Sequence, residues 1–313
     1  MSQATHPCGV FFFDKPKGWT SRKAVNHIIH TFAKPEQKNR KQRPKAGHAG
    51  TLDPLATGML PILLGDATRF ASLGLNAEKS YTVILDLSFQ TNTLDLEGEV
   101  TERYADVCVD AQTVKDVLHT FRGIIQQIPP AFSAIKVDGQ RAHALARQGK
   151  DVQLKSREVE IKALEFVSLE GCLLTLHVDC SKGTYIRSLA RDIGLALGCG
   201  GCVTMLRRTS SGGWPEQCMI TLEELEEKKE TCIIPLQVWL RDLPELVLSS
   251  TDGKRFVQGQ RLSLQSDLMK TEDEKVLCRV TYADMMLGTA IYDVTKHILQ
   301  PERVMPSAQE KLK

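Results

Sequence analysis

The order of apolar and polar residues predicts a chain that mixes helices and strands. A helix is predicted from about residue 22 to 32, because apolar residues recur there at helical spacing after the potential N-caps Thr20 and Ser21. The segment YTVILDL, which begins at Tyr81, alternates apolar and polar residues and predicts a strand. The segment AQTVKDVLHTFRG, residues 111–123, returns to helical spacing.

Turn residues divide the second half of the chain into further elements. VEIKALEFVSL and CLLTLHVDCS flank Glu170 and Gly171 and predict a β-hairpin. KGTYIRSLARDIGLALG then predicts a helix that ends near Gly198. Beyond about residue 244, short strand-like pieces separated by polar turns predict a domain boundary.

One segment, about 124–152, breaks the regular pattern. It contains Pro129, Pro130 and Gly139, and it carries a group of basic residues: Lys136, Arg141, Arg147 and Lys150. Proline and glycine interrupt both helices and strands. We therefore expect an inserted segment that protrudes from the rest of the fold.

Composition is that of a globular protein. Of the 313 residues, 42% are hydrophobic and 25% are charged, and the net charge is only +2, so any basic surface must be local. The nine cysteines are odd in number and irregularly spaced, which favours reduced thiols and a cytoplasmic location. The early apolar run Val10–Phe13 is too short to span a membrane, so no membrane association is expected.

Two local features have competing interpretations. The segment 34–45 holds six lysines and arginines against the single Glu36, and from its residues alone a solvated loop is favoured over an RNA-contacting arm. Cys199 and Cys202 have the spacing of a metal or redox pair, but no second pair completes a metal site. Phosphate-binding glycine motifs are absent from the sequence as well, so neither metal nor cofactor is expected.

The strongest candidate for chemistry is GHAGTLDPLATGMLPILLGDATRF, residues 47–70. Asp53 lies between a Gly-Thr-Leu turn and a proline, ahead of an apolar run that predicts a buried strand. A stiff backbone can present this carboxylate at a fixed angle, as a nucleophile or general base requires. An aspartate before proline is by itself more often only a turn residue, and the length of the motif is what favours a site.

This stretch resembles the signature of the TruB family of tRNA pseudouridine synthases. Further blocks resemble that family in the same order over about residues 9–240: DKPKGWTS (14–21), KSYTVILDL (79–87), FSAIKVDGQRAHALARQG (132–149), CSKGTYIRSLARDIGLALGCG (180–200) and LRR (206–208). Ordered blocks of this kind are far more specific than one short motif.

The resemblance implies an α+β fold and a reaction. The expected fold has a mixed, largely antiparallel central sheet flanked by helices, with a catalytic domain over 1–243, a small β-rich PUA-like RNA-binding domain over 244–306, and a tail over 307–313. The expected activity is isomerisation of uridine 55 in the TΨC loop of tRNA, without metal or cofactor, after the base is flipped out of its stack.

The resemblance also assigns roles to residues. Asp53 matches the catalytic nucleophile, Arg187 the arginine that pairs with it, and Tyr81 the tyrosine that lies against the target base. Asp95 matches a supporting aspartate, and Leu206 an apolar wall of the pocket. A guanidinium beside a carboxylate favours its ionised form.

Binding of RNA is assigned to a second group. His48 matches the residue that replaces the flipped base in the stack. The expected phosphate contacts are the basic residues near the motifs: Lys15, Arg69, Lys136, Arg141, Arg147 and Arg208.

Two alternatives to this enzyme stay open at this point. One is a non-catalytic tRNA-binding or tRNA-folding module, which the intact set of Asp53, Tyr81 and Arg187 argues against. The other is a guide-RNA-dependent synthase acting on ribosomal RNA, whose relatives generally carry a fuller PUA domain and terminal extensions. The expected enzyme is a monomer that needs no protein partner.

Overall fold

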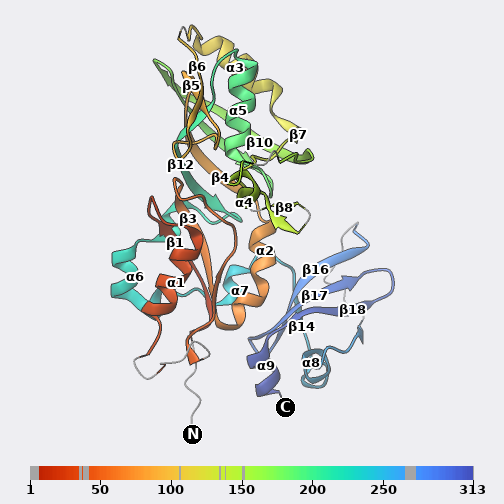
Figure 1. The fold of residues 1–313 in the computed structure, drawn as a ribbon. Coiled ribbons are helices and arrows are strands. Elements are labelled where there is room, and N and C mark those ends of the chain that lie inside the picture. The colour runs from red at the N-terminus through yellow and green to blue at the C-terminus, as the bar shows by residue number, and fades with distance from the viewer. Residues whose placement is uncertain are drawn as a thin grey trace.

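The computed structural model describes residues 7–34, 37, 42–105, 107–133, 135–137, 139–149, 152–264 and 273–312. Within these residues nine strands form one central sheet (Figure 1). Eight of them follow in spatial order: β13 (Met219–Ile220), β1 (Gly9–Lys15), β3 (Thr57–Leu64), β12 (Cys202–Ser211), β4 (Lys79–Asp86), β11 (Leu173–Cys180), β10 (Arg157–Glu170) and β7 (Gly123–Gln127). The ninth, β2 (Ala46–His48), pairs with β3.

The sheet is mixed and largely antiparallel, as expected. Among its described pairs, β1 with β13 and β12 with β3 are parallel, and the others are antiparallel. The predicted strand at Tyr81 is β4, and the predicted hairpin is β10 and β11 with Gly171 in the left-handed region at φ 61°. Glycine reaches this conformation without steric cost.

Helices cover one face of this sheet. They include α1 (Ser21–Thr31), α3 (Ala111–Thr120) and α5 (Ile186–Ala196), close to the predicted ranges. Their apolar sides enter one core with alternate residues of β4, so that Val25, Leu118 and Ile193 share a cluster with Val83 and Leu85. The intervening residues of β4 are only half-buried, on the opposite face. The period-two pattern of β4 therefore marks which face holds the core.

Smaller elements complete this part of the chain. They are η2 (Gly65–Phe70), α2 (Ala71–Asn76), β5 (Phe89–Thr91), β6 (Val100–Arg103), η3 (Glu216–Cys218), α6 (Leu222–Lys228), η4 (Lys229–Cys232) and α7 (Leu236–Trp239). The α6 helix begins with a capping box between Thr221 and Glu224.

The inserted segment begins later than the sequence predicts. Residues 124–127 are not part of it, because β7 pairs with β10 in the central sheet. After β7 come the short strands β8 (Lys136–Val137) and β9 (Gln140–Arg141), which pair only with each other, and then α4 (Ala142–Ala146). The insertion therefore starts directly after β7, the edge strand of the central sheet.

A second sheet follows residue 244. Its described strands lie in the order β14 (Glu245–Val247), β16 (Lys275–Tyr282), β17 (Met285–Asp293), β18 (Ile298–Val304) and β15 (Leu262–Ser263), with helices α8 (Ser250–Val257) and α9 (Pro306–Lys311) (Figure 1, blue). Phe256 and Leu287 share a buried cluster with Phe12, Met59 and Phe70 of the first part of the chain.

A polar contact also joins the two parts. The Asp66 carboxylate accepts a hydrogen bond of 2.8 Å from the backbone amide of Ser307, at the start of α9. No helix in the described ranges is long and apolar enough to cross a membrane.

Candidate active site

Asp53 lies in the loop between β2 and β3, and the backbone on both sides of it is held by buried groups. The Ser21 hydroxyl accepts a hydrogen bond from the Leu52 amide at 2.8 Å and donates one to the Leu52 carbonyl at 3.0 Å. The Pro54 carbonyl accepts a hydrogen bond of 2.8 Å from the Gly18 amide. The first residue of α1 and the turn before it therefore fix the residues before and after Asp53, which leaves the carboxylate little freedom to move.

Lys15 contacts the same loop. It was expected to bind a phosphate, and its contacts within the protein contradict that expectation. Its side chain is fully buried, and its ammonium group donates hydrogen bonds to the carbonyls of Trp19 at 2.6 Å and Pro16 at 3.1 Å, with the Pro54 carbonyl at 3.5 Å. Burial lowers the pKa of Lys15 to about 8, against the nearby charge of Asp53, which raises it. A buried cation engaged with carbonyls is not available to an RNA phosphate.

Arg208 was also expected to bind a phosphate, and its contacts within the protein contradict that expectation. It is 1% exposed, and its guanidinium donates to the carbonyls of Met59, at 2.5 Å, and Gly50, at 3.1 Å. Gly58 packs so closely on this strand that an added Cβ would lie 2.3 Å from the Arg208 carbonyl oxygen. Arg208 therefore supports the Asp53 loop from β12 and does not face solvent.

Arg187 and Asp53, far apart in sequence, meet at the centre of the site. Nε of Arg187 lies 2.9 Å from Oδ2 of Asp53. Nη1 donates to the Thr93 carbonyl at 2.8 Å and lies 3.4 Å from Oδ2 of Asp95, and Nη2 donates to the Phe132 carbonyl at 3.1 Å. The Arg187 side chain is 6% exposed, whereas that of Asp53 is 36% exposed. The guanidinium of Arg187 is thus held in place by its partners, while the Asp53 carboxylate remains accessible to a substrate.

Asp95 is oriented by its own turn. One of its carboxylate oxygens accepts hydrogen bonds from the Thr93 hydroxyl at 2.6 Å and the Glu97 amide at 3.0 Å, and the other oxygen faces Arg187. The Thr91 hydroxyl donates to the Asp95 carbonyl at 2.7 Å. These contacts orient the Asp95 carboxylate toward the guanidinium of Arg187.

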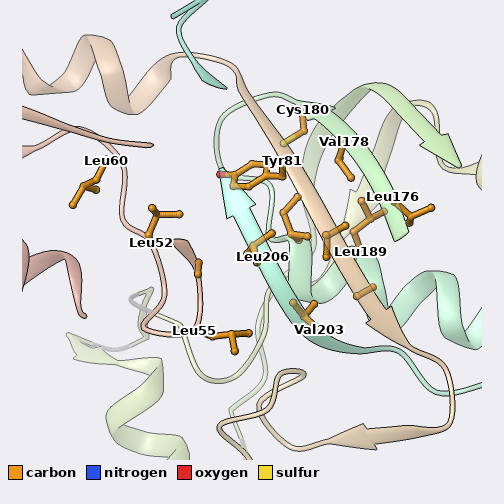
Figure 2. Close-up of a cluster of buried hydrophobic side chains, with 14 of the residues drawn as sticks. Leu52, Leu55, Leu60, Tyr81, Leu176, Val178, Cys180, Leu189, Val203 and Leu206 are labelled. Atoms are coloured by element: carbon orange, nitrogen blue, oxygen red, sulfur yellow. The ribbon is translucent and has the colours of Figure 1, made fainter. Parts of the chain in front are cut away.

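Tyr81 and Leu206 pack in one buried cluster. They lie on the neighbouring strands β4 and β12, and Figure 2 shows Leu206 beside the Tyr81 ring. Both are nearly buried, with exposures of 7% and 6%. Burial raises the pKa of Tyr81, and the charge of Asp53 raises it further, while Arg208 opposes the shift. The Tyr81 hydroxyl is therefore protonated at neutral pH.

His48 lies at the end of β2, five residues before Asp53. It is half-buried, and burial lowers the pKa of its imidazole, with additional lowering by Arg22 and Arg208. Its Nδ1 atom is buried and has no hydrogen-bond partner among the described residues. The ring is therefore neutral at physiological pH, which suits stacking better than phosphate binding.

The other expected RNA contacts are at the surface. Arg69, Arg141 and Arg147 are exposed, and the backbone of Lys136 pairs with that of Arg141. Lys150 lies outside the described residues, as do residues 35, 36 and 38–41 of the basic segment. The exposed arginines remain candidates for phosphate contacts.

The structure adds residues that the sequence pattern did not single out. Tyr185, two residues before Arg187, has its pKa raised by burial and by the charge of Asp53, and its ring lies 5.7 Å from the guanidinium carbon of Arg157. Ser21 was expected only as a helix cap, yet it holds Leu52. Tyr185 could have been proposed from its place in the arginine motif, but no local pattern connects Ser21 with a loop 31 residues away.

The Cys199 and Cys202 pair has a packing explanation. Both thiols are buried and free, and burial raises the pKa of Cys202 to about 11. A Cβ on Gly200 would lie 2.3 Å from the Phe89 carbonyl oxygen, and one on Gly201 would lie 2.2 Å from that of Ala190. The two glycines let β12 pass close to β5 and α5. Within the described ranges, no cluster of three or more possible ligands could hold a metal ion.

The chain matches two protein-family models and is similar to curated proteins. Residues 38–186 match the family described as "TruB family pseudouridylate synthase (N terminal domain)", and residues 187–243 match "tRNA pseudouridylate synthase B C-terminal domain". A tRNA pseudouridine synthase B of Ralstonia nicotianae is 38% identical over 95% of this chain and 94% of its own length. One of Ectopseudomonas mendocina is 42% identical over 80% and 82%.

The fold is also similar to that of solved structures. A chain from the crystal structure of a Cbf5-Nop10-Gar1 complex superposes with a TM-score of 0.71 at 26% identity, over 97% of this chain and 87% of that one. A chain of an H/ACA RNP bound to a substrate RNA containing 2'-deoxyuridine gives a TM-score of 0.70 at 23% identity over 96% and 86%, and so shares the fold.

Proposed function

The chain belongs to the TruB family of pseudouridylate synthases, and we propose that it isomerises uridine 55 in the TΨC loop of tRNA to pseudouridine. The observation that carries this proposal is the ion pair of 2.9 Å between Arg187 and Asp53, a carboxylate open to solvent on a fixed loop. The nearby Tyr81 and Leu206 supply an apolar surface for a base.

The reaction exchanges one bond to the sugar for another. The bond between C1′ and N1 of the uridine breaks, the base turns, and a bond between C1′ and C5 forms, while C5 loses a proton and N1 gains one. Asp53 is the nucleophile, at the sugar or at the base. Arg187 holds the carboxylate in place, and Asp95 holds the arginine. Tyr81, which is protonated because burial raises its pKa, lies against the base as a hydroxyl donor and not as a phenolate.

The uridine must leave its stack before it can reach Asp53. His48 then occupies the gap, because a neutral aromatic ring can replace stacking worth about 1–3 kcal/mol. Arg69, Arg141, Arg147 and Lys136 contact phosphates around the entrance. The second sheet, residues 244–306, contributes a further RNA-binding surface.

The enzyme acts on tRNA as a cytoplasmic monomer, without a protein partner or a guide RNA. Its relatives that are named tRNA pseudouridine synthase B support the tRNA substrate over ribosomal RNA. A non-catalytic tRNA-binding module would not require Asp53 to be held by three separate elements and paired with a buried arginine.

Release of tritium tests this function directly. The protein is incubated with an unmodified tRNA transcript labelled with tritium at uridine C5, and the wild type should release the label. Asp53→Asn, which keeps the shape of the side chain but loses its charge, should abolish release while tRNA binding persists. A wild type that binds the transcript without releasing tritium would leave only the binding module, and unchanged release by Asp53→Asn would refute the assignment of the nucleophile.

A further inference from the structure

Two arginines that no sequence motif singled out lie near the site, one on α1 and the other on β10. Arg22 stands in the first turn of α1, directly after the Ser21 that holds the Asp53 loop. Arg157 is the first residue of β10, which lies next to the edge strand β7.

Arg22 is exposed and close to His48. Its positive charge is near enough to the imidazole to lower the pKa of His48, second only to the effect of burial. Among the described residues, its guanidinium has neither a hydrogen bond nor an ion pair. An arginine that packs on no acceptor keeps all five of its donors for a ligand.

Arg157 is placed by an aromatic ring rather than by a carboxylate. Its guanidinium carbon lies 5.7 Å from the centre of the Tyr185 ring, and Tyr185 is close enough to Asp53 for the carboxylate to raise its pKa. No ion pair of Arg157 with a described acidic residue is formed. Stacking on a ring leaves the edges of a guanidinium free, and those edges match the oxygens of a phosphate.

Three other arginines are committed to partners within the protein. Arg187 and Arg208 are buried on carbonyls and carboxylates, and Arg207 forms a bidentate pair with Asp14. Arginines committed in this way stabilise the fold and cannot bind a polyanion. Arg22 and Arg157 keep their donors available, Arg22 next to the Ser21 that holds Leu52 and Arg157 against the Tyr185 ring.

We propose that Arg22 and Arg157 form a two-sided phosphate clamp, in which each guanidinium binds a phosphodiester group of the tRNA, one on the His48 side and the other on the Tyr185 side of the nucleotide that enters the site. This inference rests on the proposed function. The clamp fixes the backbone on both sides of the flipped nucleotide, so that its sugar faces Asp53.

Salt dependence of binding tests the clamp. Affinity for an unmodified tRNA transcript is measured by filter binding from about 50 to 300 mM KCl for the wild type, Arg22→Gln, Arg157→Gln and the double variant. Each lost phosphate contact removes about one released counterion, so the slope of log affinity against log salt should become shallower by about 1 in each single variant and by about 2 in the double variant. Affinity at about 0.1 M salt should fall roughly five- to tenfold per substitution.

Two further variants separate charge from packing. Arg157→Lys loses the planar group that stacks on Tyr185 but keeps the positive charge. Because the slope depends on charge, the slope of this variant should stay close to that of the wild type. Arg103→Gln removes an exposed arginine at the base of the β5–β6 hairpin, opposite Phe89, and should leave slope and affinity unchanged.

Unchanged slopes in Arg22→Gln and Arg157→Gln, with lowered thermal stability, would refute the clamp and assign the two residues to packing. The tritium assay is independent of these slopes. A wild type that releases no tritium would overturn the proposed function even if the slopes change as expected, and release with unchanged slopes would overturn the clamp alone.

Discussion

Nε of Arg187 lies 2.9 Å from Oδ2 of Asp53, although the two residues stand on elements separated by more than a hundred residues of sequence. The arginine is buried and the aspartate is partly open, so the pair divides into a fixed support and an accessible nucleophile. Among the described residues, the guanidinium also contacts Thr93, Asp95 and Phe132, which lie in loops near the site.

Arg187→Lys should therefore be far more damaging than the retained charge suggests. A lysine cannot serve the planar set of acceptors, so the Thr93 and Phe132 carbonyls and Asp95 lose partners. We expect kcat to fall by at least about 100-fold and the free energy of unfolding to fall by about 3–5 kcal/mol. Single-turnover tritium release and urea denaturation measure the two effects. Arg191→Lys, one turn later on α5, is the matched control and should retain activity within a few-fold; equal losses in both variants would contradict the role given to Arg187.

Ser21→Ala should lower kcat without weakening tRNA binding. The substitution removes both hydrogen bonds that hold Leu52, and leaving these buried backbone groups unsatisfied costs about 1–3 kcal/mol. Displacement of Asp53 then slows the reaction about ten- to hundredfold. Steady-state kinetics should show this loss in kcat with KM for tRNA nearly unchanged. Ser210→Ala, at a half-buried position of β12, serves as the control. A rise in KM at constant kcat would place Ser21 in RNA binding instead.

Lys79 should make stability depend on pH. Burial lowers its pKa from 10.5 to about 8, with further lowering by Arg208. Between these two pH values the unfolded chain binds more protons than the folded one, so the free energy of unfolding rises with pH across this window, by up to about 3 kcal/mol from Lys79. Below about pH 8 both states are protonated and the folded state carries the full penalty.

Urea denaturation at pH 7.5, 8.5 and 9.5 measures this dependence. Lys79→Met should show a smaller rise than the wild type over this range, and the part that remains reflects Lys15, whose pKa burial also lowers to about 8. In Lys254→Met, at an exposed position of α8, the free energy of unfolding should rise with pH as it does in the wild type. A rise of equal size in Lys79→Met and the wild type would show that Lys79 does not contribute.

Gly200→Ala should destabilise the fold although it adds only one methyl group. That group would lie 2.3 Å from the Phe89 carbonyl oxygen and 2.8 Å from the Phe89 nitrogen, and these backbone atoms can move away only if the strand moves. We expect a loss of at least about 1–3 kcal/mol in the free energy of unfolding. Gly171→Asn is the control, because its hairpin turn is open and asparagine tolerates a φ of 61°. Comparable losses in both variants would argue against the close packing of β5 on β12.

The sequence by itself determined the elements and the centre of the chemistry. Periodicity placed α1, α3, β4 and the β10–β11 hairpin within a few residues, because amphipathic spacing reflects which side of an element is buried. The motif resemblance identified the family, which the comparisons confirm. It also singled out Asp53 and Arg187, and the fold brings these two together.

Only the tertiary structure decided what each cation does. Lys15 and Arg208 lie inside motifs, whereas Arg22 and Arg157 lie outside them, yet in sequence each is simply a positive charge. Burial and the nearest acceptor separate them. Backbone carbonyls bind Lys15 and Arg208, whereas Arg22 and Arg157 have no acidic partner within the described ranges. The partners of a side chain come from segments that are distant along the chain, so no local pattern could have assigned them.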